Sequence, residues 1–282
     1  MLPDMFNREC ARRLERLTPG ARAGSGITSS RSPSNGSKLM NRSRSGECSR
    51  TNEKMQIEFL HLHICKRLNY NRPMIITIAS FKGGVGKTTT AVHLAACLCE
   101  RATTLLLDGD ANRSASSWAE RGSFPFKVVD ERQAAKCARD YEHIVIDTEA
   151  RPDIDDLRQL VKGCDLLVIP TTPDVLSLDA LKLTVEELKS LGADQYRVLL
   201  TIIPPRPSRD GDEAADSLKQ AGIPLFSTGI RRLVAFQKAA LSGVLVHAAK
   251  DSRAADAWAD YASIGAELFE YWNARQITEA IR

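Results

Sequence analysis

The chain has 282 residues, a length that suits one large α/β domain or two modest ones. Hydrophobic residues make up 43% and charged residues 26%, which are ordinary values for a globular protein with a sizeable core. No apolar run approaches the roughly 18 residues that a membrane span needs, and the seven cysteines include no CxxC pair. These features exclude an integral membrane protein, disfavour a disulfide framework or a zinc ribbon, and favour a cytoplasmic compartment.

The net charge of +4 is unevenly distributed along the chain. Residues 1–72 carry 14 basic and 6 acidic side chains, whereas residues 73–282 carry 25 basic and 29 acidic ones. The overall positive charge is therefore no evidence that the main domain binds nucleic acid.

We predict that residues 1–73 form a disordered basic extension. Residues 18–50 are rich in Ser, Gly and Arg and almost lack large apolar residues, so they cannot bury enough surface to offset the entropy of ordering. His61, His63 and Cys65 are too few for a structural metal site, which needs four ligands. There is no secretory signal, the acidic residues argue against a transit peptide, and we favour an upstream extension or a misassigned start before Met74.

From Met74 onwards, short apolar β-type runs alternate with segments of helical spacing. The expected strands cover residues 74–80, 103–108, 126–130, 143–148, 165–170 and 196–203. The expected helices cover residues 88–100, 112–122, 131–140, 153–162, 175–191, 210–221, 232–242 and 252–274. This alternation predicts an α/β domain over 74–282, with a mostly parallel twisted sheet flanked by helices on both faces.

The strand at 74–80 runs into a glycine-rich loop that opens a helix, the context that a phosphate-binding loop requires. Glycines allow consecutive backbone N–H groups to converge on an anion, and the helix N-terminus adds partial positive charge. Lys87 is expected to reach the β- and γ-phosphates, and the Thr88 hydroxyl to ligate Mg²⁺. The strict GxxxxGK[ST] pattern fails only because Phe81 occupies its first position. The expected ATP contacts in this loop are Lys82, Gly83, Gly84, Val85, Gly86, Lys87, Thr88 and Thr89.

Asp147 follows four β-type residues, which places it at the carboxyl end of a strand, where ligands of open α/β sheets bind. It is expected to hold Mg²⁺, through water. The segment after strand 196–203 reads Ile-Pro-Pro-Arg-Pro rather than the guanine-selective NKxD, so ATP is favoured over GTP. Pro204 and Pro205 are the expected adenine wall.

The segment FKGGVGKTTTAVHLA at 81–95 resembles the deviant Walker A motif of the ParA/MinD superfamily, and the chain is most similar to short ParA-type partition ATPases of the cyanobacterial kind. The resemblance implies a P-loop NTPase in which Lys82 reaches across an ATP-sandwiched homodimer to the partner's phosphates. LLLDGD at 105–110 resembles the Walker A′ segment, which implies that Asp108 lies near Mg²⁺ and that Asp110 positions the attacking water. Ala111-Asn112 replaces the usual Pro-Gln there, which loosens the loop. The implied catalytic residues are Lys82, Lys87 and Asp110.

The family resemblance also implies what ATP binding is for. Such ATPases bind nonspecific DNA as ATP dimers, and a ParB-like or other cargo-adaptor protein stimulates hydrolysis and release. The implied role is nucleoid-associated segregation of plasmid or chromosome DNA, or spacing of a cellular cargo, with no stable membrane insertion. Arg231, Arg232 and Lys238 are the expected DNA contacts, and Arg232 falls where the family has a DNA-contacting arginine. The alternative is a MinD-like membrane-cycling regulator of cell division, but the C-terminus lacks a basic amphipathic helix.

Overall fold

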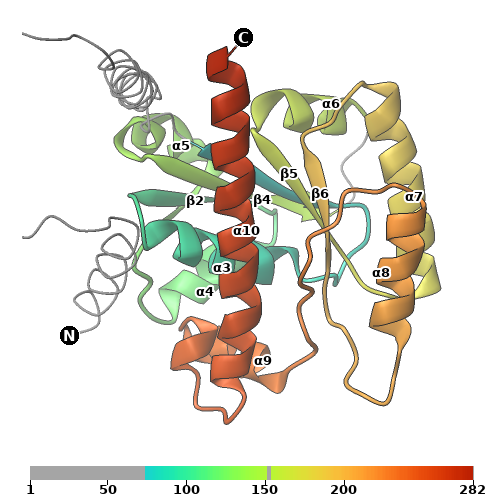
Figure 1. Cartoon of the computed structure of the whole chain (residues 1–282). Coiled ribbons are helices and arrows are strands. Elements are labelled where there is room, and N and C mark those ends of the chain that lie inside the picture. Colours follow the sequence, from blue (N-terminus) through green and yellow to red (C-terminus); the bar gives the residue numbers. More distant parts are fainter. Residues whose placement is uncertain (1–73, 151–153, 282) are drawn as a thin grey trace, which may run out of the picture. The chain divides into compact units, whose positions relative to one another are not determined.

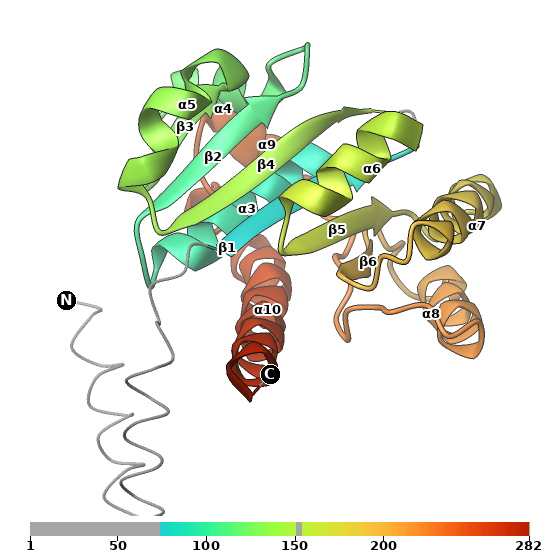
Figure 2. The same cartoon turned by 90° about the horizontal axis from the view of Figure 1, so that it is seen from above.

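A computed structural model describes residues 74–150 and 154–281 of the chain. All six expected strands form, and they pair into one parallel sheet with the order β3-β2-β4-β1-β5-β6 (Figures 1 and 2). The strands are β1 (Met74–Ser80), β2 (Thr104–Gly109), β3 (Lys127–Asp130), β4 (His143–Ala150), β5 (Leu166–Thr171) and β6 (Tyr196–Leu200). The predicted parallel sheet is confirmed, whereas the predicted extension at 1–73 lies outside the described residues.

Helices cover both faces of the sheet, as its continuously apolar strands require. In β5, Leu166 and Val168 join one core cluster while Leu167 and Ile169 join the other, because successive side chains of a strand point to opposite faces. The first cluster is covered by α3 (Lys87–Cys99), α4 (Ser114–Glu120), α9 (Val234–Ser242) and α10 (Ala254–Ile281). The second is covered by α6 (Ile154–Gly163), α7 (Val175–Ser190) and α8 (Asp210–Gln220), and α5 (Glu131–Cys137) packs beside β2 and β3. Figure 1 shows α10 running across the front of the sheet.

Several element boundaries differ from the prediction. The expected helix at 131–140 divides into α5 and a 3-10 turn, η1 (Ala138–Asp140), and a second 3-10 turn, η2 (Val246–Ala248), was not foreseen. The last helix continues to Ile281 because residues 275–281 contain no helix breaker. None of the helices in the described ranges is long and apolar enough to cross a membrane.

The prediction that strand 196–203 continues to its prolines was wrong by three residues. β6 ends at Leu200, because Ile202 has a φ of 52° and turns the chain before Pro204 is reached. A β-branched residue in this left-handed region is strained, so the surrounding structure must hold the turn in place.

The parallel arrangement brings the carboxyl ends of the strands to one edge of the sheet. β1 leads there into the glycine-rich loop, and in β2 and β4 Asp108 lies directly opposite Asp147 in the strand register. Three motifs that are separate in sequence therefore meet at one edge, where ligands of open α/β sheets bind.

A buried histidine ties α3, the helix after the glycine-rich loop, to the C-terminal part of the domain. His93 has no exposed surface, and its Nε2 accepts a hydrogen bond of 3.1 Å from the Val246 backbone N–H. The ring proton therefore lies on Nδ1, which donates to the Thr89 carbonyl at 2.7 Å. The ring also stacks on Tyr261 with centroids 4.7 Å apart. Burial lowers the pKa of His93 to about 4, and the hydrogen bond to the Thr89 carbonyl opposes that shift only in part.

We predict that acid destabilises the protein through His93. The unfolded chain binds this proton below a pKa of 6.5 and the folded chain only below about 4, so stability is lost as the pH falls through that window. The loss amounts to about 3 kcal/mol. Urea unfolding of the wild type and of His93→Gln between pH 7 and pH 4 measures it. The neutral Gln variant should lack this part of the pH dependence, and identical pH profiles for the two proteins would contradict the assignment.

Candidate nucleotide site

The loop between β1 and α3 has the backbone geometry of an anion cradle. Gly84 and Gly86 have φ values of 78° and 86°, a region that glycine adopts without steric cost. Gly86 is the N-cap of α3 in this left-handed conformation, and no described side chain caps the first turn of the helix. The free N–H groups of that turn, together with the partial positive charge of the helix end, form a binding place for a phosphate.

Asp147 is a buried carboxylate without a hydrogen-bond partner. It has no exposed surface, and neither side-chain oxygen lies within normal hydrogen-bond geometry of a donor among the described residues, although the Thr88 side chain is near enough to favour the charged form. Burial raises the pKa of Asp147 to about 7; nearby Thr88 and Lys87 oppose the rise, and Asp108 adds to it. A buried carboxylate is costly without a cation, so this arrangement favours binding a positive ion at Asp147.

The two carboxylates of the β2 end are already engaged by the backbone. Asp108 is buried and accepts hydrogen bonds from the N–H groups of Ser116 at 2.7 Å and Asp110 at 3.3 Å. Asp110 accepts from the N–H and the side-chain amide of Asn112, at 3.0 and 3.1 Å, and from the Ser114 hydroxyl at 3.4 Å. Asn112 thus engages Asp110 in a loop that lacks the family's proline.

These residues fit a Mg²⁺ ion bound together with a nucleotide. No group of three or more His, Cys, Asp and Glu side chains that could hold a metal alone occurs in the described ranges 74–150 and 154–281. Mg²⁺ is usually held by one or two carboxylates plus substrate phosphates and water, which matches Asp147 with its two unpartnered oxygens and the neighbouring Thr88. Asp108 lies beside them, but its oxygens are occupied by N–H donors.

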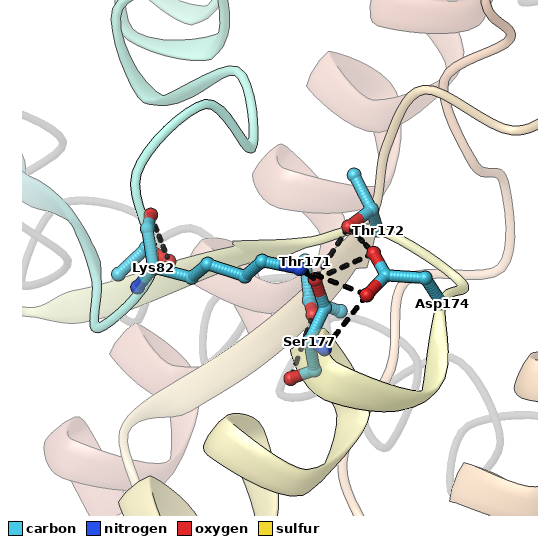
Figure 3. A network of polar contacts seen from close by, with 6 residues as sticks. Lys82, Thr171, Thr172, Asp174 and Ser177 are labelled. Atoms are coloured by element: carbon cyan, nitrogen blue, oxygen red, sulfur yellow. Dashed lines mark hydrogen bonds and ion pairs between the residues drawn. The ribbon is translucent and has the colours of Figure 1, made fainter.

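Lys82 does not point along the loop with Lys87. Its ammonium lies 2.8 Å from Asp174 Oδ1 and 2.7 Å from Ser177 Oγ, at the start of α7 (Figure 3). Asp174 is the N-cap of α7 and accepts hydrogen bonds from the Ser177 N–H and hydroxyl and from the Thr172 hydroxyl. Burial would raise the pKa of Asp174, but the donors Lys82, Thr172 and Ser177 outweigh it and hold the pKa well below its usual range. Lys82 therefore lies in a polar cluster near the surface, whereas Lys87 is buried.

The predicted DNA contacts differ in their environment. Arg231 donates to both oxygens of Asp260 and to the Asp256 carbonyl, and Lys238 pairs with Asp251 at 2.8 Å. Arg232 is exposed, and its side chain has no ion-pair partner among the described residues. Of the three, only Arg232 offers a charge that is not already neutralised within the chain.

The sequence prediction missed the residues whose side chains hydrogen-bond to the glycine-rich loop and hold it in place. Asp174 and Ser177 accept from the Lys82 ammonium, and Thr172 bonds to both of them. The Thr201 hydroxyl donates to the carbonyl of Val85 inside the glycine-rich loop. Asp174 could have been found, because Asp immediately before a helix is a strong N-cap signal. Thr201 carried no signal, since a threonine at a strand end is ordinary. Pro204 and Pro205 follow β6 at this edge, and their role as an adenine wall stays a prediction.

Comparisons with known proteins agree with this geometry. A family model described as the CobQ/CobB/MinD/ParA nucleotide binding domain matches residues 76–246. A protein of Gloeobacter kilaueensis named maintenance of carboxysome distribution protein A is 37% identical over 207 residues, which cover 71% of this chain and 96% of the relative.

Solved structures show the same fold. A plasmid partition protein of Borrelia burgdorferi B31 bound to AMPPNP superposes with a TM-score of 0.56 at 20% identity, covering 71% of this chain and 99% of that chain. An ATP complex of a Cyanothece McdA variant superposes with a TM-score of 0.55 at 16% identity, covering 75% of this chain and 97% of that chain. The expected phosphate-loop NTPase fold is thereby confirmed.

We predict that Asp147→Asn separates stability from ligand binding. At pH 8 the substitution removes a buried, unpartnered negative charge, so the ligand-free protein should gain about 1–3 kcal/mol of stability. The same variant should lose the extra thermal stability that Mg²⁺ with ADP confers on the wild type. Thermal unfolding with and without Mg²⁺-ADP measures both effects. Asp194→Asn, the same change at an exposed loop position, is the matched control and should leave both quantities unchanged. A destabilised Asp147→Asn protein that still responds fully to Mg²⁺-ADP would contradict the assignment.

Proposed function

Because the chain belongs to the CobQ/CobB/MinD/ParA nucleotide-binding domain family, we propose that it is a dimerising positioning ATPase. In its ATP state it binds nonspecific DNA as a homodimer, and a partner protein stimulates hydrolysis and releases it. The observation that carries this proposal is the pair of lysines in one glycine-rich loop. Lys87 is buried at the phosphate cradle, while Lys82 extends to the surface at the start of α7. Lys82 therefore does not contact the phosphate site of its own loop and is free to act on a second subunit.

The nucleotide would be held by groups that already face one edge of the sheet. The N–H groups of residues 83–89 and the Lys87 ammonium bind the phosphates, and Thr88 and Asp147 hold Mg²⁺ with Asp108 beside them. Bound Mg²⁺ supplies neutralisation of the charge that develops on the transferred phosphoryl group. Asp110, whose carboxylate accepts from Asn112 and Ser114, is the residue that we propose orients the attacking water.

Lys82 can leave its present partners at little cost. Its side chain is 35% exposed and that of Asp174 is 49% exposed, and an exposed ion pair of this kind contributes at most about 1 kcal/mol. A phosphate with two or more negative charges in a second subunit is a stronger partner for an ammonium group than one exposed carboxylate. An ATP-bound partner subunit would therefore draw Lys82 across the interface. We propose that the γ-phosphate is the group that Lys82 reaches there, so ADP, which lacks it, would not draw Lys82 across.

Arg232 is the proposed DNA contact. A dimer presents it twice, and contacts to phosphate give affinity without sequence selectivity. The relative named for carboxysome distribution supports the spacing of a cellular cargo, and the neighbour named as a plasmid partition protein supports the segregation of DNA. The higher identity of the first leads us to favour the spacing of a compartment-like cargo.

We predict that Lys82→Ala separates nucleotide binding from dimerisation. The variant keeps Lys87 and the backbone cradle, so its affinity for Mg²⁺-ADP should stay within about threefold of the wild type. It should remain a monomer with a non-hydrolysable ATP analogue, under conditions in which the wild type sediments as a dimer. Lys182→Ala removes another exposed, ion-paired lysine from the neighbouring α7 and should still dimerise. A normal ATP-dependent dimer of Lys82→Ala would refute the cross-subunit role.

We predict that Arg232→Glu weakens DNA binding without affecting nucleotide affinity. Because each dimer exchanges two favourable phosphate contacts for two repulsive ones, the affinity for duplex DNA should fall by at least about tenfold at low salt. Fluorescence anisotropy with a labelled duplex of arbitrary sequence measures it. Arg132→Glu makes the same charge change on α5, at the β3 edge of the sheet, and should have a much smaller effect. Equal losses in the two variants would show that only net charge matters and that the DNA surface lies elsewhere.

A further inference from the structure

Thr201 connects the end of β6 to the glycine-rich loop. Its side chain is buried, with 2% exposure, and its hydroxyl oxygen lies 2.7 Å from the Val85 carbonyl oxygen. The Thr171 carbonyl lies 3.1 Å from the same hydroxyl, but it already accepts the Thr201 backbone N–H at 2.8 Å. Because the Val85 carbonyl is the nearer of the two acceptors, the single hydroxyl proton goes mainly to Val85. Resting on the nucleotide-binding function proposed above, we propose that Thr201 is a positioning residue that orients the phosphate cradle.

The effect on the cradle follows from the planarity of the peptide bond. The Val85 carbonyl and the Gly86 N–H belong to one trans peptide unit, so they point in opposite directions. The Thr201 hydroxyl draws the carbonyl into the protein interior, and the Gly86 N–H is thereby turned outward, away from β6. Gly86 is the N-cap of α3, so this N–H lies at the beginning of the phosphate-binding turn.

The loop has few other means of fixing this peptide. Gly84 and Gly86 flank Val85, and both have φ values that only glycine adopts freely, so the neighbouring backbone is the most rotatable part of the loop. The Val85 side chain is buried and anchors the residue, but a side chain does not set the rotation of the following peptide. The Thr201 hydroxyl supplies that constraint, and an orientation fixed before binding lowers the entropic cost when the nucleotide arrives.

The position of Thr201 is itself held from both sides. Its N–H is bonded to β5, and one residue later the chain turns at Ile202. Two backbone hydrogen bonds then fix Ile203. Its N–H donates to the Ile230 carbonyl, and its carbonyl accepts from the Arg232 N–H. The hydroxyl is therefore presented from a segment held on both sides.

Three variants of the full-length chain test this role: Thr201→Val, Thr201→Ala and Thr201→Ser. Val keeps the branched shape but replaces the hydroxyl with a methyl group that faces the Val85 carbonyl, so Ala serves as a second way of removing the hydroxyl. Both should bind a fluorescent ADP analogue with Mg²⁺ about tenfold more weakly, as expected for the loss of one buried hydrogen bond. Ser keeps the hydroxyl and should stay within about twofold of the wild type.

Competition by inorganic pyrophosphate locates the defect. A misoriented cradle weakens the binding of pyrophosphate and of the ADP analogue by the same factor. Damage to the neighbouring adenine wall would weaken the binding of the ADP analogue and leave the binding of pyrophosphate unchanged. Thermal unfolding without nucleotide shows how much of each variant is folded, and affinities are compared for the folded fraction.

Each outcome decides the role of Thr201. Full affinity in a folded Val or Ala variant, a Ser variant as weak as Val and Ala, or unaffected pyrophosphate binding would overturn it. A wild-type chain that binds no nucleotide would refute the proposed function together with this role, whereas failure of the variants alone to lose affinity would refute only the role of Thr201.

Discussion

The site depends on a carboxylate that is buried where burial disfavours its charge more than the neighbouring Thr88 and Lys87 favour it. Asp147 is completely buried at the end of a central strand, and neither of its oxygens lies within normal hydrogen-bond geometry of a donor among the described residues. The parallel sheet imposes this position, because β4 lies between β2 and β1 and ends at the edge where the glycine-rich loop begins. A carboxylate held in this way is poorly stable alone and well suited to a cation that arrives with a phosphate. The buried carboxylate thus lowers the stability of the ligand-free protein at the position where the ligand is proposed to bind.

A short path of hydrogen bonds links the glycine-rich loop to the proposed DNA contact Arg232. Thr201 bonds to the glycine-rich loop, and Ile203, two residues later, accepts the Arg232 N–H. The turn between them is held at Ile202 in a conformation that β-branched residues avoid. Lys82 leaves the same loop in another direction, toward α7. One loop therefore has short connections both to the surface where a second subunit is proposed to bind and to the segment that carries the proposed DNA contact.

The fold could be predicted from the sequence because its signals are local and repeated. Six apolar β-type runs, each followed by a helical segment, leave little choice but a parallel sheet, and all six strands formed. The boundaries were less certain, as at β6, where the strain at Ile202 ended the strand before the prolines could. The glycine-rich loop and the three aspartates were found because each motif lies within a few consecutive residues.

The supporting contacts could not be predicted, since they join residues far apart in sequence. The Thr201 hydroxyl meets Val85 across 116 positions, and Lys82 meets Asp174 across 92. The pairing of Arg231 with Asp260 likewise depends on how α10 packs, and it leaves Arg232 as the free charge of the predicted patch. Sequence patterns identify which groups can bind a ligand, whereas only the packed structure shows which of them are already engaged.

The most direct test of the account is DNA binding by the full-length chain in two nucleotide states across a salt series. With Mg²⁺ and a non-hydrolysable ATP analogue, the account predicts binding to duplexes of unrelated sequence, with an affinity that falls steeply as salt increases. With Mg²⁺-ADP it predicts little binding. Equal binding in both states would contradict it, because charge attraction from the basic residues 1–72 would then be enough to explain the affinity without any switch.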